Sequence, residues 1–275
     1  MSYIDAATAP QRNTGQIKLY DGAAFEGMRK AGRMAAEALD LMALEVRPGV
    51  TTADLDQIVF NFARDQGALP ATLYYRGYTH SICTSINHVV CHGIPNDKPL
   101  REGDILNIDV TLIVDGWHGD TSRMYTVGEV SRRAERLIDI THQAMWRGIH
   151  AVAPGKKTGD IGAAIQAFAE SERASVVRDF CGHGVGQVFH DTPNILHYGT
   201  GGEGIELKPG MIFTIEPMIN LGRPHVKILA DGWTAVTRDR SLSAQFEHSV
   251  GVTETGYEAF TISPGGYDKP PYRAV

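Results

Sequence analysis

The sequence predicts an α+β protein built from two structurally related halves that deliver acidic side chains to one central site. Two observations predict this arrangement: a hairpin that carries two aspartates on one face, and an internal repeat of helix, turn and strand. Helical and strand patterns alternate between residues 21 and 263, whereas residues 1–20 and 264–275 are expected to form terminal tails. We therefore expect one domain over 21–263, with halves of about 21–130 and 131–263.

Composition describes an ordinary globular chain. The 275 residues are 43% hydrophobic and 21% charged, with a net charge of -6, which gives no support for a nucleic-acid footprint. Three cysteines form no C-x-x-C pair, so neither a disulfide framework nor a cysteine-rich zinc site is expected. The first 20 residues lack the basic and apolar regions of a signal peptide, and no apolar run approaches the ~18 residues of a membrane span. We expect a cytoplasmic protein without a membrane partner.

The predicted hairpin begins with a strand over residues 105–114. Its even positions are all apolar, while Asp109 lies on the other face, as in a half-buried strand of period two. The dipeptide Asp115-Gly116 that follows is a strong signal for a two-residue hairpin turn. Asp109 should therefore point away from the more apolar face of a two-stranded ribbon.

This turn fixes the register of the hairpin. With Asp115 and Gly116 at its tip, Thr111 faces Asp120 and Asp109 faces Ser122. Asp109 and Asp120 then become diagonal neighbours on one face, with backbones roughly 7–8 Å apart. Two unpaired carboxylates at this distance repel each other and raise each other's pKa, so a cation between them is the simplest explanation.

A pair of helices occurs twice. Residues 25–45 have apolar side chains at helical spacing and end before Pro48-Gly49, and a second helix is expected from Thr52 to about Gln66. Residues 134–171 follow the same plan at an offset of 106. The matching positions are Pro48, Gly49, Thr52, Asp54, Phe62 and Ala63 with Pro154, Gly155, Thr158, Asp160, Phe168 and Ala169. This sustained offset favours two related halves over chance matches in loops.

The strand also repeats. Residues 100–109 align with residues 207–216 at an offset of 107, which sets Asp109 against Glu216. Each half also contains an Asp-Gly-Trp turn, at 115–117 and at 231–233, although these are offset by 116. Equivalent strands are therefore expected to bring one acid each to the central site.

Three further side chains complete the candidate metal site. Glu216 ends a strand and precedes a proline, while Glu247 is expected on an alternating strand that also exposes Gln245 on the same face. His183 lies between glycines that permit close backbone approach, and neutral imidazole is a common metal ligand. The glycine spacing there lacks the dinucleotide pattern and the lysine of a phosphate loop.

Together these residues offer four carboxylates and one imidazole. Four negative charges balance two divalent ions, and the acids can bridge them. Oxygen ligands with one imidazole favour Co, Mn, Fe(II) or Zn over a metal that prefers thiolates. We therefore predict two divalent metal ions as cofactors.

Five motifs carry a resemblance to a known family: I-D-V at 108–110, G-D-T at 119–121, G-H-G-V-G at 182–186, T-I-E-P-M at 214–218 and Q-F-E-H-S at 245–249. In order and spacing they resemble the metal-ligand motifs of type I methionine aminopeptidases, over about residues 17–262. The resemblance implies the pita-bread fold, with two α/β halves related by a pseudo-two-fold axis around a central antiparallel sheet. It makes residues 21–263 a catalytic metallopeptidase domain.

The resemblance also implies roles for these residues. The ligands of a dinuclear metal centre would be Asp109, Asp120, His183, Glu216 and Glu247, with Asp120 and Glu247 bridging the ions. His92, in V-C-H-G-I-P, would contact the substrate near the scissile nitrogen, and His190 would hold the scissile carbonyl. Glu216 would handle the proton of the attacking water.

The methionine pocket of the family is apolar and aromatic, which suits a thioether. The matching positions are Tyr75, Tyr78, Cys83, Phe189 and Trp233, and Thr72 departs from a cysteine found in some members. Cys91 precedes His92, but neighbours on a strand point to opposite faces, which argues against a thiol dyad.

The implied activity is removal of the initiator methionine from nascent proteins with small second residues, by two-metal-assisted peptide hydrolysis. The expected partners are the N-terminal methionine of nascent polypeptides and, transiently, the ribosome. A monomer is expected.

Four alternatives fit the sequence less well. X-Pro dipeptidases and aminopeptidase P generally carry an additional N-terminal domain, whereas here the catalytic region begins near residue 20. A non-catalytic member of the family would lack metal ligands, and a mononuclear iron oxygenase would leave the extra acids unexplained. The type II form needs a helical insertion, and the steps of 33 and 31 residues from His183 to Glu216 to Glu247 leave no room for it.

Overall fold

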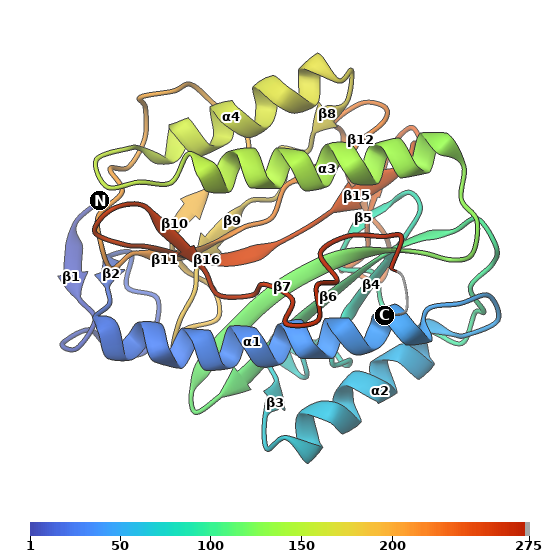
Figure 1. The fold of residues 1–275 in the computed structure, drawn as a ribbon, viewed down its shortest axis with the longest axis horizontal. Helices are drawn as coiled ribbons and strands as arrows, with labels where there is room; N and C mark the ends of the chain where they lie inside the picture. The colour runs from blue at the N-terminus through green and yellow to red at the C-terminus, as the bar shows by residue number, and fades with distance from the viewer. Residues whose placement is uncertain (273–275) are drawn as a thin grey trace.

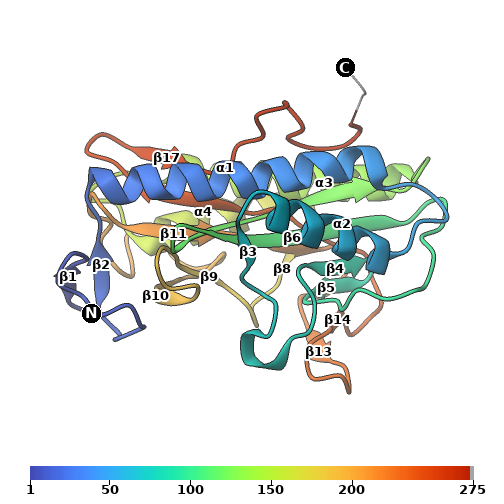
Figure 2. The same cartoon turned by 90° about the horizontal axis from the view of Figure 1, so that it is seen from below.

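The computed structural model describes residues 1–272, in which helices cover one side of a set of mainly antiparallel sheets (Figures 1 and 2). The α-helices are α1 (Gly22–Glu45), α2 (Thr52–Asp65), α3 (Arg132–His150) and α4 (Thr158–Ser171), with a short 3-10 turn at Tyr75–Gly77. The strands of the first half are β3 (Leu69–Pro70), β4 (Cys83–Ile86), β5 (Val89–Cys91), β6 (Ile105–Val114) and β7 (Trp117–Thr126), preceded by β1 (Tyr3–Asp5) and β2 (Ile17–Leu19). Those of the second half are β8 (Ser175–Val176), β9 (Gly182–Gly184), β10 (Asp191–Ile195), β11 (Ile212–Ile215), β12 (Met218–Asn220), β13 (Val226–Ile228), β14 (Ala235–Thr237), β15 (Ser243–Gln245), β16 (His248–Val252) and β17 (Tyr257–Ala259).

The repeated helix pair is present in both halves. Helices α2 and α4 each have 14 residues and begin 106 positions apart, at Thr52 and Thr158. In both, the aspartate of the first turn accepts a hydrogen bond from the backbone N–H of the residue before the helix, at 3.0 Å for Asp54 and 2.8 Å for Asp160. Figure 1 shows α1 with α2 along one edge of the molecule and α3 with α4 along the other, as two related halves require.

The hairpin β6–β7 has the predicted register. Its pairs run from Val114 opposite Trp117 to Ile105 opposite Thr126, and Asp109 faces Ser122. Asp115 and Gly116 both have positive φ, 50° and 84°, as a primed two-residue turn requires. The apolar face of β6 is fully buried beneath α1 and α2, at Leu106, Ile108, Val110 and Leu112. The prediction that Asp109 points away from this face is confirmed.

The strand expected around Glu247 is interrupted. Strand β15 ends at Gln245 and β16 begins at His248, so Glu247 lies between two strands rather than within one. The break occurs because the chain changes partners, since β15 pairs with β12 and β16 pairs with β11. At the break the backbone N–H of Glu247 donates to the Ser122 carbonyl at 3.0 Å, which joins the second half to β7 of the first.

The terminal segments are folded rather than free. Strand β1 pairs in parallel with β2, and the Tyr3 hydroxyl donates to the Glu206 carbonyl at 2.7 Å. At the other end, the Tyr272 hydroxyl donates to the Met124 carbonyl at 2.7 Å, while the last three residues of the expected tail, 273–275, lie outside the described residues. Both expected tails therefore pack on the domain, each through a tyrosine hydroxyl that donates to a backbone carbonyl.

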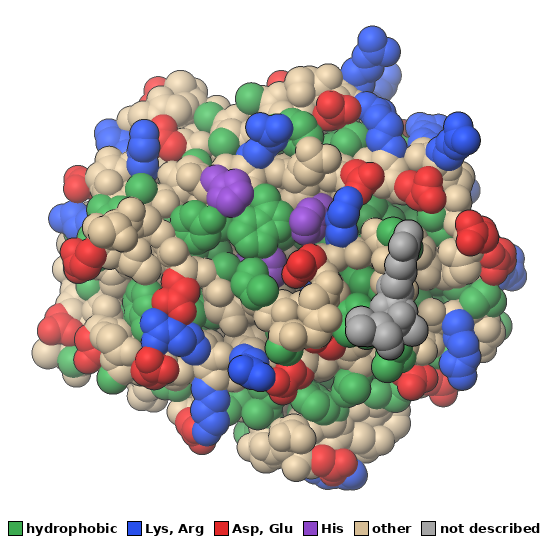
Figure 3. Space-filling model, viewed as in Figure 1, with side chains coloured by type: hydrophobic (Ala, Val, Ile, Leu, Met, Phe, Trp, Pro, Cys, Tyr) green, Lys and Arg blue, Asp and Glu red, His purple; other side chains and the backbone are tan. Residues whose placement is uncertain are grey.

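The surface agrees with the modest net charge. Figure 3 shows acidic and basic side chains scattered over the helical face, with hydrophobic and histidine side chains gathered near its centre. Within residues 1–272, no helix combines the length and the apolar character needed to cross a membrane.

Close packing of α1 on β7 depends on Gly119. A Cβ atom built there would lie 2.2 Å from the backbone oxygen of Ala31 in α1, which cannot move without displacing the helix. We expect Gly119→Ala to lower the free energy of unfolding by at least about 2 kcal/mol, because rigid backbone is overpacked. Gly22→Ala is the control, since a Cβ atom there would have no heavy atom within 4 Å, and it should change stability by less than about 0.5 kcal/mol. Urea unfolding of both variants checks this, and equal stabilities would contradict it.

Candidate metal centre and active site

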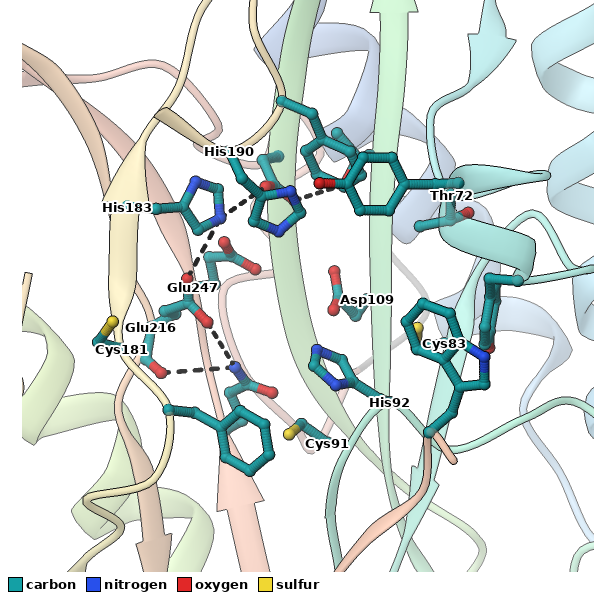
Figure 4. A pocket seen from close by; sticks show the side chains of 18 of the residues that line it. Thr72, Cys83, Cys91, His92, Asp109, Cys181, His183, His190, Glu216 and Glu247 are labelled. Carbon is teal, nitrogen blue, oxygen red and sulfur yellow. Dashed lines mark hydrogen bonds and ion pairs between the residues drawn. The ribbon is translucent and has the colours of Figure 1, made fainter. Parts of the chain in front are cut away.

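One cavity of about 360 Å³ lies between the two halves and collects every site residue predicted from the sequence. Its lining includes the five candidate metal ligands, the histidines His92 and His190, and the five pocket positions Tyr75, Tyr78, Cys83, Phe189 and Trp233. Figure 4 shows the labelled acids and histidines pointing toward one another across this space. Segments more than 100 residues apart in sequence therefore converge on one point.

The candidate metal ligands form a tight cluster. Ligand atoms of Asp120, His183 and Glu247 all lie within 4.8 Å of one another. The His183 Nε2 is 3.6 Å from a carboxylate oxygen of Asp120 and also 3.6 Å from one of Glu216. Asp109 lies on the same face of the hairpin as Asp120, diagonally across β6 and β7. The cluster thus combines strands β6, β7 and β9 with the residues that follow β11 and β15.

The electrostatics of this cluster favour a bound cation. Burial and the Asp120 charge raise the pKa of Asp109 well above its ordinary value, and burial raises the pKa of Asp120 to about 6. The pKa values of Glu216 and Glu247 are raised in the same way, first by burial and then by the neighbouring carboxylates. Divalent ions would remove both the repulsion and the desolvation penalty, so the donor set fits divalent metal.

The protonation state and orientation of His183 suit it to bind a metal ion. Burial lowers its pKa to about 4, so the imidazole is neutral near pH 7. Its Nδ1 lies 3.0 Å from the Gly184 carbonyl, which can only accept, so Nδ1 carries the hydrogen. The Nε2 lone pair therefore faces the carboxylates, in the orientation that a metal-binding histidine needs.

Three polar residues that sequence reasoning did not select hold the acids in place. The Thr111 hydroxyl donates to Asp120 at 2.6 Å, and the Thr214 hydroxyl donates to Glu216 at 2.8 Å. The Gln245 amide donates to the other oxygen of Glu216 at 3.3 Å. A usable signal was present, because Thr214 precedes Glu216 by two residues and Thr111 is the cross-strand partner of Asp120.

The substrate side of the cavity is lined by rings. The His190 ring lies 4.2 Å from the His183 ring and stacks on Tyr75 at 5.2 Å between centroids. Burial lowers the pKa of His190 to about 3, and burial also lowers the pKa of His92. Both histidines are therefore neutral near pH 7.

A second group of rings closes the opposite wall. Trp233 packs edge-on against Tyr78 at 5.1 Å and against His92 at 6.2 Å. Phe180 and Met218, which sequence reasoning missed, also line the cavity. Phe180 belongs to no motif that distinguishes it from a core residue, whereas Met218 ends the motif T-I-E-P-M at 214–218 and could have been found from it. Thr72 lies in the lining, and its hydroxyl donates to the His80 carbonyl at 3.0 Å.

Cys91 and His92 do not point to opposite faces, contrary to the prediction from strand alternation. Both residues line the cavity, because β5 ends at Cys91 and His92 has a left-handed φ of 56°. Figure 4 shows both side chains on the cavity side. A thiol dyad is still disfavoured on chemical grounds, since burial raises the pKa of Cys91 well above its ordinary value and keeps the thiol protonated.

Two related α/β halves around a buried cluster of acids and histidine define a metallopeptidase of the pita-bread class, and comparisons with known proteins agree. Residues 26–254 match metallopeptidase family M24. A methionine aminopeptidase of Rickettsia prowazekii is 58% identical over 258 residues, covering 93% of this chain and 99% of that protein. The chain belongs to metallopeptidase family M24 and, within it, to the methionine aminopeptidases.

Solved structures support this assignment. The crystal structure of the Rickettsia prowazekii methionine aminopeptidase matches with a TM-score of 0.89, covering 90% of this chain and all of that one. A methionine aminopeptidase from Thermotoga maritima, 38% identical, matches with a TM-score of 0.88 over 90% of this chain and 99% of that one. The prolidase from Pyrococcus furiosus shares the fold at 22% identity and a TM-score of 0.69. The predicted fold class is confirmed.

Proposed function

We propose that this enzyme removes the initiator methionine from nascent proteins with small second residues, by hydrolysis at the cluster between its two halves. The expected class, a methionyl aminopeptidase, is confirmed by family membership, and that family also implies divalent metal. The observation that carries the proposal is the convergence of five metal-type ligands and two neutral histidines in one cavity. Its volume of about 360 Å³ suits one methionine and a small neighbour better than a long peptide.

The residues of the cavity divide the work of binding. The methionine side chain would lie among Tyr75, Tyr78, Cys83, Phe189 and Trp233, where sulfur–ring contacts favour a thioether. His92 would contact the scissile nitrogen. His190, neutral and able to donate through a ring N–H, would bind the scissile carbonyl oxygen as negative charge develops there.

Glu216 would move the proton. It would take a proton from the attacking water and return it to the leaving nitrogen, so that one water is consumed and a free amine leaves. Its two oxygens accept hydrogen bonds from Thr214 and Gln245, which fixes the orientation of the carboxylate. Bound divalent ions would supply Lewis-acid activation of the carbonyl and of the water.

We further propose that two divalent ions bind, and that Asp109, Asp120, His183, Glu216 and Glu247 would hold them. Four carboxylates for one cation would leave excess negative charge buried, whereas two divalent ions balance it. Oxygen donors with one imidazole favour Mn, Fe(II), Co or Zn.

The test is methionine release from Met-Ala-Ser by enzyme purified without oxygen and loaded separately with each of these four metals. We expect release with at least one metal, no cleavage of an Ala-Pro substrate, and close to two equivalents of bound metal. Inactivity with all four metals would overturn the proposed activity, whereas cleavage of Ala-Pro would favour the X-Pro peptidases. Residence in the cytoplasm, a monomeric state and a transient ribosome contact remain predictions.

A further inference from the structure

The segment Gln11–Tyr20, here called the N-terminal strap, lies against the loop Gly186–Thr192 that carries His190. Sequence reasoning treated this segment as part of a tail. In the structure Lys18 and Asp191 form an ion pair, with Nζ and Oδ2 2.6 Å apart, and both side chains are buried, at 6% and 4% exposure. A buried pair of this kind joins the two segments rigidly, because separating the charges would leave each without a partner.

Asn13 reaches the backbone of His190 itself. Its amide nitrogen donates to the His190 carbonyl at 3.4 Å, and its amide oxygen accepts from the Thr192 hydroxyl at 3.1 Å. Both halves of one side chain therefore hold the two sides of Asp191. A further hydrogen bond, from Gln11 to Gln187 at 3.3 Å, extends the contact along the loop.

The strap also fits the start of the loop. A Cβ atom at Gly186 would lie 2.6 Å from the Tyr20 hydroxyl, so the strap and the loop are in close contact there. On its other side the loop is held by His118, whose Nδ1 lies 2.8 Å from the Gly186 carbonyl and whose ring stacks on Phe189 at 5.5 Å. The loop is thus held between hairpin β6–β7 and the strap.

We propose that the strap is a positioning element for the reaction, and that Asn13 and Lys18 set the place of His190 in the cavity. This inference rests on the proposed role of His190 at the scissile carbonyl. The His190 ring stacks on Tyr75 and lies tilted against His183. Ring contacts of this kind tolerate sliding, so the backbone position decides where the N–H of His190 points. Misplacement of such a donor by about 1 Å can cost about 10²-fold in rate.

The first experiment compares Asn13→Ala and Lys18→Met with Asp5→Ala in the full, metal-loaded chain. Asp5 belongs to the same N-terminal segment but accepts its hydrogen bond from Ala7, away from the loop. On Met-Ala-Ser we expect kcat/KM to fall about threefold to tenfold for Asn13→Ala and more for Lys18→Met, mainly through kcat. Asp5→Ala should match the parent, and metal content should be unchanged in all three.

A double-mutant cycle then separates positioning from general destabilisation. In a His190→Ala background the donor is absent, so Asn13→Ala and Lys18→Met should each change kcat/KM by less than about twofold. If each substitution lowered kcat/KM in the His190→Ala background by the same factor as in the parent enzyme, the proposal would be overturned. The Lys18→Met variant leaves Asp191 buried without its partner, which can impair folding. If that variant does not fold, Asn13→Ala alone tests the proposal, because the Asn13 side chain is exposed. An inactive parent enzyme would instead overturn the proposed function. An unaffected His190→Ala variant would overturn the role of His190, and this inference with it, while leaving the proposed activity in place.

Discussion

Replacing Asp120 with asparagine is expected to abolish metal binding at one position and to lower kcat/KM for Met-Ala-Ser by at least about 10³-fold. Asp120 is the acid that lies in the three-residue cluster with His183 and Glu247 and also accepts from Thr111. An amide keeps the shape but removes the charge that balances a divalent ion. The metal content measured per protein chain should fall together with the rate, because both depend on the same carboxylate.

Asp115→Asn is the matched control for this prediction. It makes the same chemical change on the same hairpin, but Asp115 lies exposed at the turn, paired with Lys30. Exposed pairs of this kind contribute about 0–1 kcal/mol, so metal content and rate should match the parent. If Asp120→Asn retained both full metal content and full activity, Asp120 would not be a ligand.

The second large effect concerns the metal-free protein, whose stability we expect to fall as the pH rises from about 6.5 to 8. The pKa values of Asp109, Glu216 and Glu247 are raised by burial and by neighbouring carboxylates. A carboxyl with a raised pKa in the folded state binds its proton more tightly when folded, so stability is lost as the pH rises from the ordinary pKa toward the raised one. Bound metal replaces these protons, so the loaded enzyme should show little change over this range.

Buried histidines oppose this loss at lower pH. Burial lowers the pKa of His197 and of His248 to about 3, and the pKa of His142 to about 4. These groups stay neutral in the folded state but take up a proton when unfolded, so their contribution to stability is lost as the pH falls below about 6.5. Between about pH 4.5 and 6.5 the histidines and the acids act in opposite directions, and the uncompensated loss from the acids begins above about pH 6.5.

Thermal unfolding from about pH 5 to about pH 8.5, with and without metal, tests the loss of stability from the acids and the opposing contribution of the histidines. The gain in Tm on adding metal should grow with pH, since protons compete with metal for the same oxygens. An enzyme whose metal-free and metal-loaded forms respond identically between about pH 6.5 and 8 would show that the four acids do not form one buried site.

Local sequence patterns were sufficient to predict the elements whose structure depends on nearby residues. The alternation of residues 105–114 and the Asp115-Gly116 turn determined the hairpin and its register, because a two-residue turn fixes every cross-strand pair. The same-face position of Asp109 and Asp120 followed. The helix pairs followed from stop and start signals at Gly49 and Thr52 and their counterparts, since capping depends on neighbours three residues away.

The repeat, local alternation and the family motifs supplied the remaining members of the site, but not how they are held. Glu247 was expected inside a strand and instead lies at a change of strand partner, which no alternation along one segment can reveal. Cys91 and His92 share the cavity because the backbone turns left-handed at His92, a choice made by tertiary contacts. The polar support from Gln245 becomes visible only once separate strands are brought together, whereas Thr214 lies two residues before Glu216 on the same segment.

The sequence by itself determined how the central hairpin is paired and which side chains are candidates for the metal and substrate site, because both depend on short-range periodicity and motif order. Only the tertiary structure decided which distant residues contact the loop that carries His190. Residues 11–20 carry no pattern that predicts a role, yet they form a buried ion pair with Asp191, more than 170 positions away. Contacts of that range are set by how the two halves close on each other, and local propensity contains no information about them.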